Sequence, residues 1–161
     1  MGMISRLIGT PPIHPVLFYS GKILGYLIWG IFLLSALDCI NFPGVSLPVL
    51  RYIAYGLTFF GLLIVIISLI NLGNSTRFGL PTNSTSFKTK GLYRLSRNPM
   101  YLGLHLFTLA SIIYLANIFI LIIGIYSLLV YHFIILAEEK FLEARFGRDY
   151  VEYKKKVRRY I

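Results

Sequence analysis

The longest uncharged stretch of this chain constrains its fold more than any other feature. Residues 98–137 contain 40 consecutive positions without Asp, Glu, Lys or Arg, between Arg97 and Glu138. As a single helix this stretch would extend about 60 Å, roughly twice the hydrocarbon thickness of a bilayer. We therefore expect it to fold back on itself near Ala116 and Asn117, which leaves two membrane spans of about 18–20 residues each.

Two further apolar segments precede this hairpin. Residues 52–76 are 25 uncharged positions, enough for one span. Residues 15–37 form another span if Lys22 extends its amine toward the membrane surface. Gly21 and Gly25 form a pair of small residues four positions apart, which predicts close helix packing in this first span.

These spans predict an all-α fold, an integral membrane helical bundle. It should contain about four transmembrane helices, followed by a cytoplasmic amphipathic helix at the C-terminus. Charged residues make up 14% of the chain, against about 25% in soluble domains. A length of 161 residues corresponds to one domain.

Basic residues lie almost entirely on one side of the predicted bundle. That side comprises the N-terminus, the loop 77–97 and the C-terminal tail, and it holds 15 of the 16 Lys and Arg residues, with only Arg51 on the other. The positive-inside rule then places both termini of this multi-pass protein in the cytoplasm. A net charge of +10 beside apolar spans favours anionic lipid headgroups as partners. Too little soluble chain remains for a nucleic-acid-binding face.

Polar motifs mark both edges of the uncharged stretch. Pro99 suits the first turn of a helix, Asn98 is a candidate N-cap, and free N–H groups there could bind an anion. Glu138 and Glu139 are expensive to bury and are expected at the interface, where a carboxylate could bind an ammonium, a sulfonium or ribose hydroxyls. An ordinary helix start and a membrane-exit flank would carry similar residues.

The remaining polar candidates lie within the last two spans and in the tail. His105 and His132 are candidates to line a substrate pocket, because polar side chains inside a membrane usually face protein or a cavity. Apolar and basic residues alternate at helical spacing after residue 137, which predicts an amphipathic helix broken near Gly147. Its Tyr150 and Tyr153 are further candidates for substrate contact. No His/Cys cluster has metal-binding spacing, and no catalytic residue stands out.

Three ordered motifs resemble a family of integral membrane methyltransferases, which includes the isoprenylcysteine carboxyl methyltransferases and the phosphatidylethanolamine N-methyltransferases. The family's Arg-His-Pro-x-Tyr, hydrophobic stretch and Glu-Glu correspond to Arg97-Asn98-Pro99-Met100-Tyr101, the predicted hairpin and Glu138-Glu139. A preceding loop of the type Leu-Val-Thr-x-Gly-x-Tyr is similar to residues 87–93. A tail of the type Phe-Gly-x-x-Tyr-x-x-Tyr is similar to residues 146–153, so the resemblance covers about residues 75–160.

This resemblance implies methyl transfer from S-adenosyl-L-methionine to a lipid-soluble or membrane-embedded acceptor at the cytoplasmic face. It divides the single domain 1–161 into N-terminal spans, 1–76, and a cofactor-binding core, 77–161. The cofactor's carboxylate would meet Arg97 and the helix start, and its amino group or ribose would meet Glu139. The family's cofactor contacts correspond to Thr85, Ser86, Phe87, Lys88, Tyr93, Arg97, Asn98, Pro99, Met100, Tyr101, Glu138 and Glu139.

Two substitutions distinguish the chain from this pattern, and two other functions remain open. Asn98 replaces the family's His, and its amide can donate a hydrogen bond but cannot titrate near neutrality. Ile135 occupies a position where prenylcysteine enzymes have Arg, which favours a lipid amine or another amphiphile as acceptor. One alternative is an NADPH-dependent sterol-type reductase, although Leu104 stands where those enzymes have Asp. The other is a non-catalytic membrane scaffold.

Overall fold

The computed structural model describes residues 11–44, 47–73 and 87–161. Its elements are the helices α2 (Pro15–Ala36), α3 (Pro48–Leu72), α4 (Pro99–Leu115), α5 (Ile118–Phe146) and α6 (Arg148–Lys156), with a short 3-10 helix, η2 (Gly91–Arg94). These residues contain no named strand. The predicted all-α bundle is thus confirmed, although the second long helix begins at Pro48, four residues earlier than expected.

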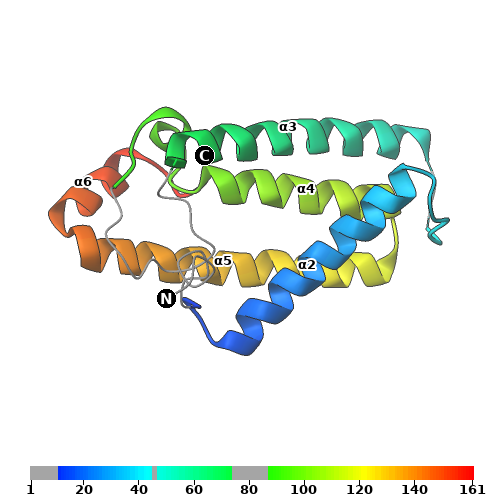
Figure 1. Ribbon diagram of the computed structural model, residues 1–161, viewed down its shortest axis with the longest axis horizontal. Coiled ribbons are helices and arrows are strands. Elements are labelled where there is room, and N and C mark those ends of the chain that lie inside the picture. Colours follow the sequence, from blue (N-terminus) through cyan, green and yellow to red (C-terminus); the bar gives the residue numbers. More distant parts are fainter. Residues whose placement is uncertain (1–10, 45–46, 74–86) are drawn as a thin grey trace.

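The helices form an elongated bundle, and the short helix α6 lies at one end of it (Figure 1). α3 lies along α4, and α2 crosses α5 at an angle and also contacts α4. η2 packs on α3, and α6 turns back from the end of α5. The chain then ends beside the start of α4, which brings the last residues to the motif at 97–101.

Three of the described helices are long and apolar enough to cross a membrane. α2, α3 and α5 contain 22, 25 and 29 residues. α4 is apolar but shorter, with 17 residues, which corresponds to about 26 Å at 1.5 Å per residue. The protein is therefore an integral membrane protein built from apolar helices.

The uncharged stretch folds back where its length requires. Ala116 adopts a left-handed conformation, with φ of 39°, and ends α4. Asn117 is the N-cap of α5, and its side chain accepts a hydrogen bond from Phe119 N at 2.9 Å. Its Nδ2 also donates to Pro43 O at 2.9 Å, which ties this turn to the connection after α2. The predicted break after α5 is confirmed as well, at Gly147 with φ of 54°.

Small residues allow the helix backbones to approach closely, as the glycine pair in α2 predicts. Ser127 Oγ of α5 donates to Gly21 O at 3.0 Å, and a Cβ on Gly25 would lie 2.6 Å from the same hydroxyl. A second contact joins α3 and α4, where a Cβ on Gly61 would lie 2.8 Å from Gly103 O. Such contacts replace the hydrophobic effect as the source of helix association in lipid.

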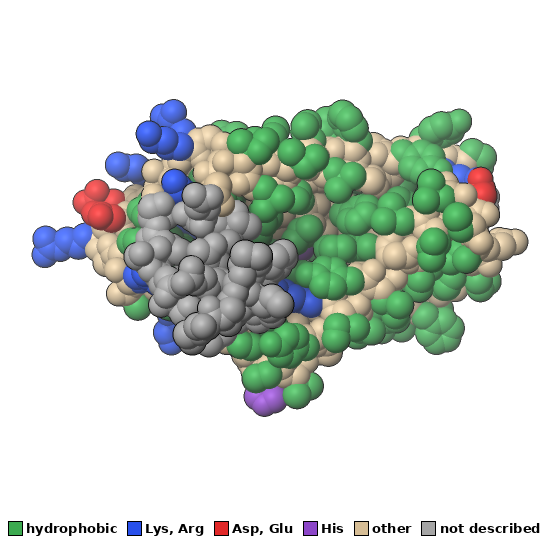
Figure 2. Space-filling view, in the orientation of Figure 1, with side chains coloured by type: hydrophobic (Ala, Val, Ile, Leu, Met, Phe, Trp, Pro, Cys, Tyr) green, Lys and Arg blue, Asp and Glu red, His purple; other side chains and the backbone are tan. Residues whose placement is uncertain are grey.

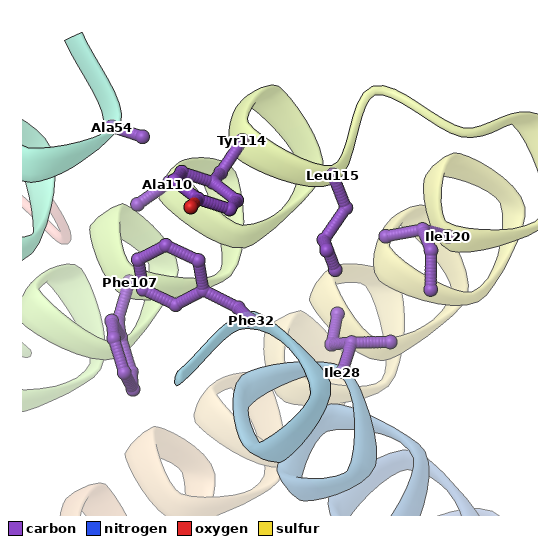
Figure 3. Packing of buried hydrophobic residues seen from close by; sticks show 8 residues of the cluster. All are labelled: Ile28, Phe32, Ala54, Phe107, Ala110, Tyr114, Leu115 and Ile120. Atoms are coloured by element: carbon purple, nitrogen blue, oxygen red, sulfur yellow. The ribbon is translucent and has the colours of Figure 1, made fainter. Parts of the chain in front are cut away.

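Apolar side chains fill the space between α2, α3, α4 and α5 away from the charged end (Figure 3). The ring of Phe32 lies 5.1 Å from that of Tyr114 and 5.7 Å from that of Phe107, in edge-to-face arrangements. Trp29 Nε1 donates to Thr108 Oγ1 at 3.0 Å, so the indole also finds a partner. The buried members of this cluster are Ile28, Phe32, Ala54, Phe107, Ala110, Tyr114, Leu115 and Ile120.

Charged side chains gather at one end of the bundle. In Figure 2 apolar side chains cover most of the visible surface over α2 and α3, and most charged side chains lie around the end that carries α6. We call this region the polar end and define it as residues 87–98, residues 138–146 of α5, α6, and the C-terminal segment 157–161. It contains Arg97, Asn98, Glu138 and Glu139.

Candidate functional site

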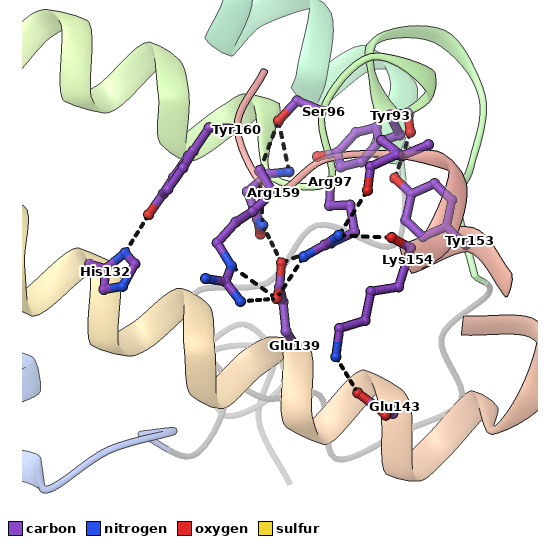
Figure 4. A network of polar contacts seen from close by, with 12 residues as sticks. Tyr93, Ser96, Arg97, His132, Glu139, Glu143, Tyr153, Lys154, Arg159 and Tyr160 are labelled. Atoms are coloured by element: carbon purple, nitrogen blue, oxygen red, sulfur yellow. Dashed lines mark hydrogen bonds and ion pairs between the residues drawn. The ribbon is translucent and has the colours of Figure 1, made fainter. Parts of the chain in front are cut away.

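The motifs at the two edges of the uncharged stretch meet at the polar end (Figure 4). Arg97 lies just before α4, and Glu139 lies near the end of α5. Arg97 Nε donates to Glu139 Oε1 at 3.0 Å, and Arg97 Nη2 donates to Glu139 Oε2 at 3.1 Å. This paired arrangement is the strongest geometry available to a guanidinium and a carboxylate. The hairpin of α4 and α5 thus brings the two motifs into direct contact.

Both partners of this ion pair are buried. Their side chains are 8% and 5% exposed, so Glu139 is buried within the protein despite the cost of burying a carboxylate. Its burial is tolerated because Arg97 supplies charge and hydrogen bonds together. Burial alone would lower the pKa of Arg97, but the hydrogen bonds and charge of Glu139 raise it above its usual value. Arg97 Nη1 also donates to Val157 O at 2.8 Å and to Lys154 O at 3.3 Å.

Asn98 occupies the N-cap position of α4, but its side chain does not cap the helix. Its Nδ2 instead donates to Glu139 Oε1 at 2.9 Å and to Arg159 O at 3.3 Å. A hydrogen bond to a carboxylate is stronger than one to a backbone amide, which explains the choice. The backbone N–H of Asn98 donates to Ser96 Oγ at 3.1 Å. The amide therefore supplies a donor toward the glutamate motif at the position where the resembling family has His.

The C-terminal segment completes this network, although none of the sequence motifs predicts that it returns to Arg97. Arg97 N donates to Arg158 O at 2.9 Å, and Ser96 Oγ donates to Arg159 O at 3.1 Å. The side chain of Arg159 reaches Glu139 Oε2 through Nε at 3.1 Å and Nη2 at 3.0 Å. The only sequence signal for this return is that apolar residues, among them Tyr160, continue past the amphipathic helix.

Glu139 has no spare capacity to accept further hydrogen bonds in this arrangement. Its two oxygens offer about four lone-pair sites, and Arg97, Asn98 and Arg159 together direct five donor contacts at them. Two guanidinium groups also outnumber the one carboxylate. The cluster therefore carries one excess positive charge at the end of an apolar bundle.

Glu138 faces a different environment from its neighbour, because adjacent helical residues project about 100° apart. Tyr101 Oη donates to Glu138 Oε1 at 2.8 Å. Tyr101 itself is buried, and its ring lies 5.9 Å from that of Tyr131. The two glutamates thus fix two different faces of the α4–α5 contact, one toward the C-terminal segment and one toward the bundle interior.

The two predicted pocket histidines are brought together by Tyr160. The Tyr160 hydroxyl lies 2.7 Å from His132 Nδ1, as a hydrogen bond whose donor depends on the tautomer. The His105 ring lies 5.8 Å from that of Tyr160. His105 Nε2 is buried without a hydrogen-bond partner among the described residues. A buried polar atom left in this way costs free energy unless a ligand meets it.

Tyr150 and Tyr153 lie in a separate aromatic cluster, where α6 packs against the segment before α4. The ring of Phe87 lies 5.2 Å from those of Phe146 and Tyr153. Tyr153 Oη donates to Tyr93 O at 2.5 Å, and burial raises the pKa of this hydroxyl to about 12. Both tyrosines are buried, and their position accounts for the attachment of α6; their contact with a substrate stays a prediction.

The other predicted cofactor residues make none of the contacts with Glu138 or Glu139 described above. Pro99 is buried in the first turn of α4, as expected, and Met100 beside it is half-buried. Lys88 is exposed. Thr85 and Ser86 lie outside the described residues.

The comparison with known families agrees with this geometry. Residues 49–149 match the family model described as phospholipid methyltransferase, while no curated protein matches the chain. The matched region includes α3, both edges of the uncharged stretch and the start of α6, and it ends before the C-terminal segment. It extends further toward the N-terminus than the three sequence motifs do. Because the match covers more than half of the chain, this protein belongs to the phospholipid methyltransferase family.

Proposed function

We propose that this protein transfers a methyl group from S-adenosyl-L-methionine to the headgroup of a membrane lipid. The observation that carries the proposal is the direct contact of Arg97 and Asn98 with Glu139 at one end of an apolar bundle. It assembles polar groups for a charged ligand beside helices that lipid can surround. Membership of the family supplies the reaction class and the lipid as substrate.

The polar end is proposed to face the cytoplasm, with four passes and both termini on that side. The distribution of basic residues supports this orientation, since cytoplasmic segments are enriched in Lys and Arg. Arg51 lies in the first turn of α3, at the opposite end of the bundle from α6. The basic residues of α6 would then meet anionic headgroups, with Lys154, Lys155 and Lys156 in its last turn.

The chemistry of the polar end fits an S-adenosyl cofactor. Such a cofactor supplies a methyl group already activated on a sulfonium, together with a carboxylate, an ammonium and a nucleoside. The excess positive charge around Glu139 suits the carboxylate, and aromatic rings stabilise a neighbouring sulfonium. The described residues proposed to form its site are Phe87, Lys88, Tyr93, Arg97, Asn98, Pro99, Met100, Tyr101, Glu138 and Glu139. Glu139 contributes by holding the guanidinium groups in position. Their contribution is to position the donor and to exclude water.

The acceptor headgroup is proposed to approach from the side of His105 and His132. His105 Nε2 has no partner among the described residues and could accept a hydrogen bond from the acceptor's nucleophile. His132 is held by Tyr160, which fixes the orientation of its ring. A neutral imidazole there could take the proton that an amine nucleophile loses on methylation.

The test is calorimetric binding of S-adenosylhomocysteine to the detergent-purified protein and to Glu139→Gln. We expect Glu139→Gln to weaken binding at least about tenfold, because the two guanidinium groups lose the carboxylate that holds them in position. Glu143→Gln is the matched control, since the Glu143 side chain pairs with Lys154 alone among the described residues, and the two side chains are 42% and 41% exposed. Labelled methyl transfer into extracted lipids then identifies the acceptor.

Folded wild-type protein that binds no S-adenosylhomocysteine would contradict this proposal. NADPH binding by the same preparation would then favour the sterol-type reductase. Failure to bind either cofactor would favour a scaffold that keeps the fold for packing.

A further inference from the structure

The two guanidinium groups at Glu139 differ in what they have left to offer a ligand. Arg97 uses Nε, Nη1 and Nη2 on described acceptors, and its side chain is 8% exposed. Arg159 uses Nε and Nη2 on Glu139, and its side chain is 33% exposed. Its Nη1 donates to no acceptor among the described residues, and in Figure 4 this outer nitrogen is turned away from Glu139. Arg97 thus has a structural role in the protein interior, while Arg159 keeps N–H donors that a ligand can reach.

The position of Arg159 is fixed from both the backbone and the side chain. Its carbonyl accepts hydrogen bonds from Ser96 Oγ at 3.1 Å and from Asn98 Nδ2 at 3.3 Å. Its guanidinium is held by two contacts to Glu139 Oε2. A guanidinium that is held along one edge presents the other in a fixed direction, which suits paired recognition of a carboxylate.

We propose that Arg159 binds the carboxylate of the methyl donor's amino acid group through this accessible edge. The inference rests on the proposed function, and it moves the carboxylate contact from Arg97, whose donors are used, to a residue outside the matched family region. The excess positive charge of the cluster resides on the guanidinium that a ligand can reach. Glu139 then serves to hold and orient Arg159 as well as Arg97.

Comparing the affinities of two ligands isolates the contribution of the carboxylate contact from that of the rest of the cofactor. S-adenosylhomocysteine carries the amino acid group, and 5′-methylthioadenosine keeps the nucleoside and the thioether without it. We expect Arg159→Gln to raise the calorimetric Kd of S-adenosylhomocysteine at least about tenfold, the size of a lost charge-assisted hydrogen bond. The Kd of 5′-methylthioadenosine should hardly change. Arg159→Lys should fall between, because it keeps the charge and loses the planar fork.

Arg158→Gln is the matched control, because the Arg158 side chain is exposed and its contacts with the described residues around Ser96 and Arg97 run through its backbone. Arg159→Gln should still fold, since Arg97 and Asn98 continue to satisfy Glu139, and a thermal melt checks this. Equal S-adenosylhomocysteine affinity in the two Gln variants would overturn this inference and leave the proposed function standing. The same would follow if Arg159→Gln raised the Kd of both ligands equally. Folded wild-type protein that binds neither ligand would overturn the proposed function and this inference with it.

Discussion

The two ends of the bundle are held together by different forces. At the turn end, which we define as residues 37–44 and the α4–α5 turn at 116–117, neutral hydrogen bonds of Asn117 accompany apolar packing. At the polar end, three charged side chains and an amide form one partly buried network. The turn end loses little when a single contact is removed. At the polar end, a buried carboxylate depends on charged partners, so removing its buried partner Arg97 should cost more than removing the more exposed Arg159.

Among changes that test the difference between the two ends, Arg97→Met is expected to lower the free energy of unfolding the most. It leaves Glu139 with Arg159 alone as counter-charge and frees the carbonyls of Val157 and Lys154. Breaking a buried ion pair typically costs about 3–5 kcal/mol of unfolding free energy. Thermal unfolding in detergent, followed by the fluorescence of Trp29, measures the loss.

The control for this prediction is Arg94→Met, because Arg94 is exposed in η2. It should change the melting temperature little. Trp29 is the only tryptophan and lies among the apolar helices, so it reports whether the bundle follows the polar end. An Arg97→Met protein as stable as Arg94→Met would mean that the network contributes nothing to folding.

A smaller effect is expected where α3 and α4 touch between the two ends. Gly61→Ala places a Cβ 2.8 Å from Gly103 O and 3.2 Å from Leu106 Cβ, so the helices must separate slightly. Overpacking of this kind costs about 1–3 kcal/mol. Gly56→Ala in the same helix meets nothing within 4 Å and should be neutral or stabilising, since Ala favours helices. Equal melting temperatures for the two variants would show that the close approach is not required.

The turn end could be predicted from the sequence because local rules determine it. An uncharged stretch of 40 residues is too long for one span, and Asn117 is a good N-cap at its midpoint. Gly147 likewise marks the end of α5, because its φ of 54° suits glycine. The resemblance to a family predicts that Arg97 and Glu139 share one cofactor site, but it does not predict that they bond to each other, since spacing alone does not say which residues meet.

The rest of the polar end could not be predicted, because it depends on where the chain returns in space. Arg159 follows a run of basic residues and looks in the sequence like another headgroup contact. Its contact with Glu139 requires α6 to turn back and the C-terminal segment to pair with Ser96. Asn98 was expected to cap α4, and only the nearby carboxylate redirects its side chain.

The smallest effect is expected at the turn end, for Asn117→Ala. This change removes the cap on Phe119 N and the donor to Pro43 O, and loss of an N-cap costs about 1 kcal/mol. Asn117→Asp keeps the capping oxygen and loses only the tether, so it should recover most of the stability in the same thermal melt. Failure of Asn117→Asp to recover it would assign the turn's stability to the tether across the two connections. Neither variant should alter S-adenosylhomocysteine binding, because the turn lies at the opposite end of α4 and α5 from Glu139. A changed Kd would mean that the two ends are coupled through the hairpin.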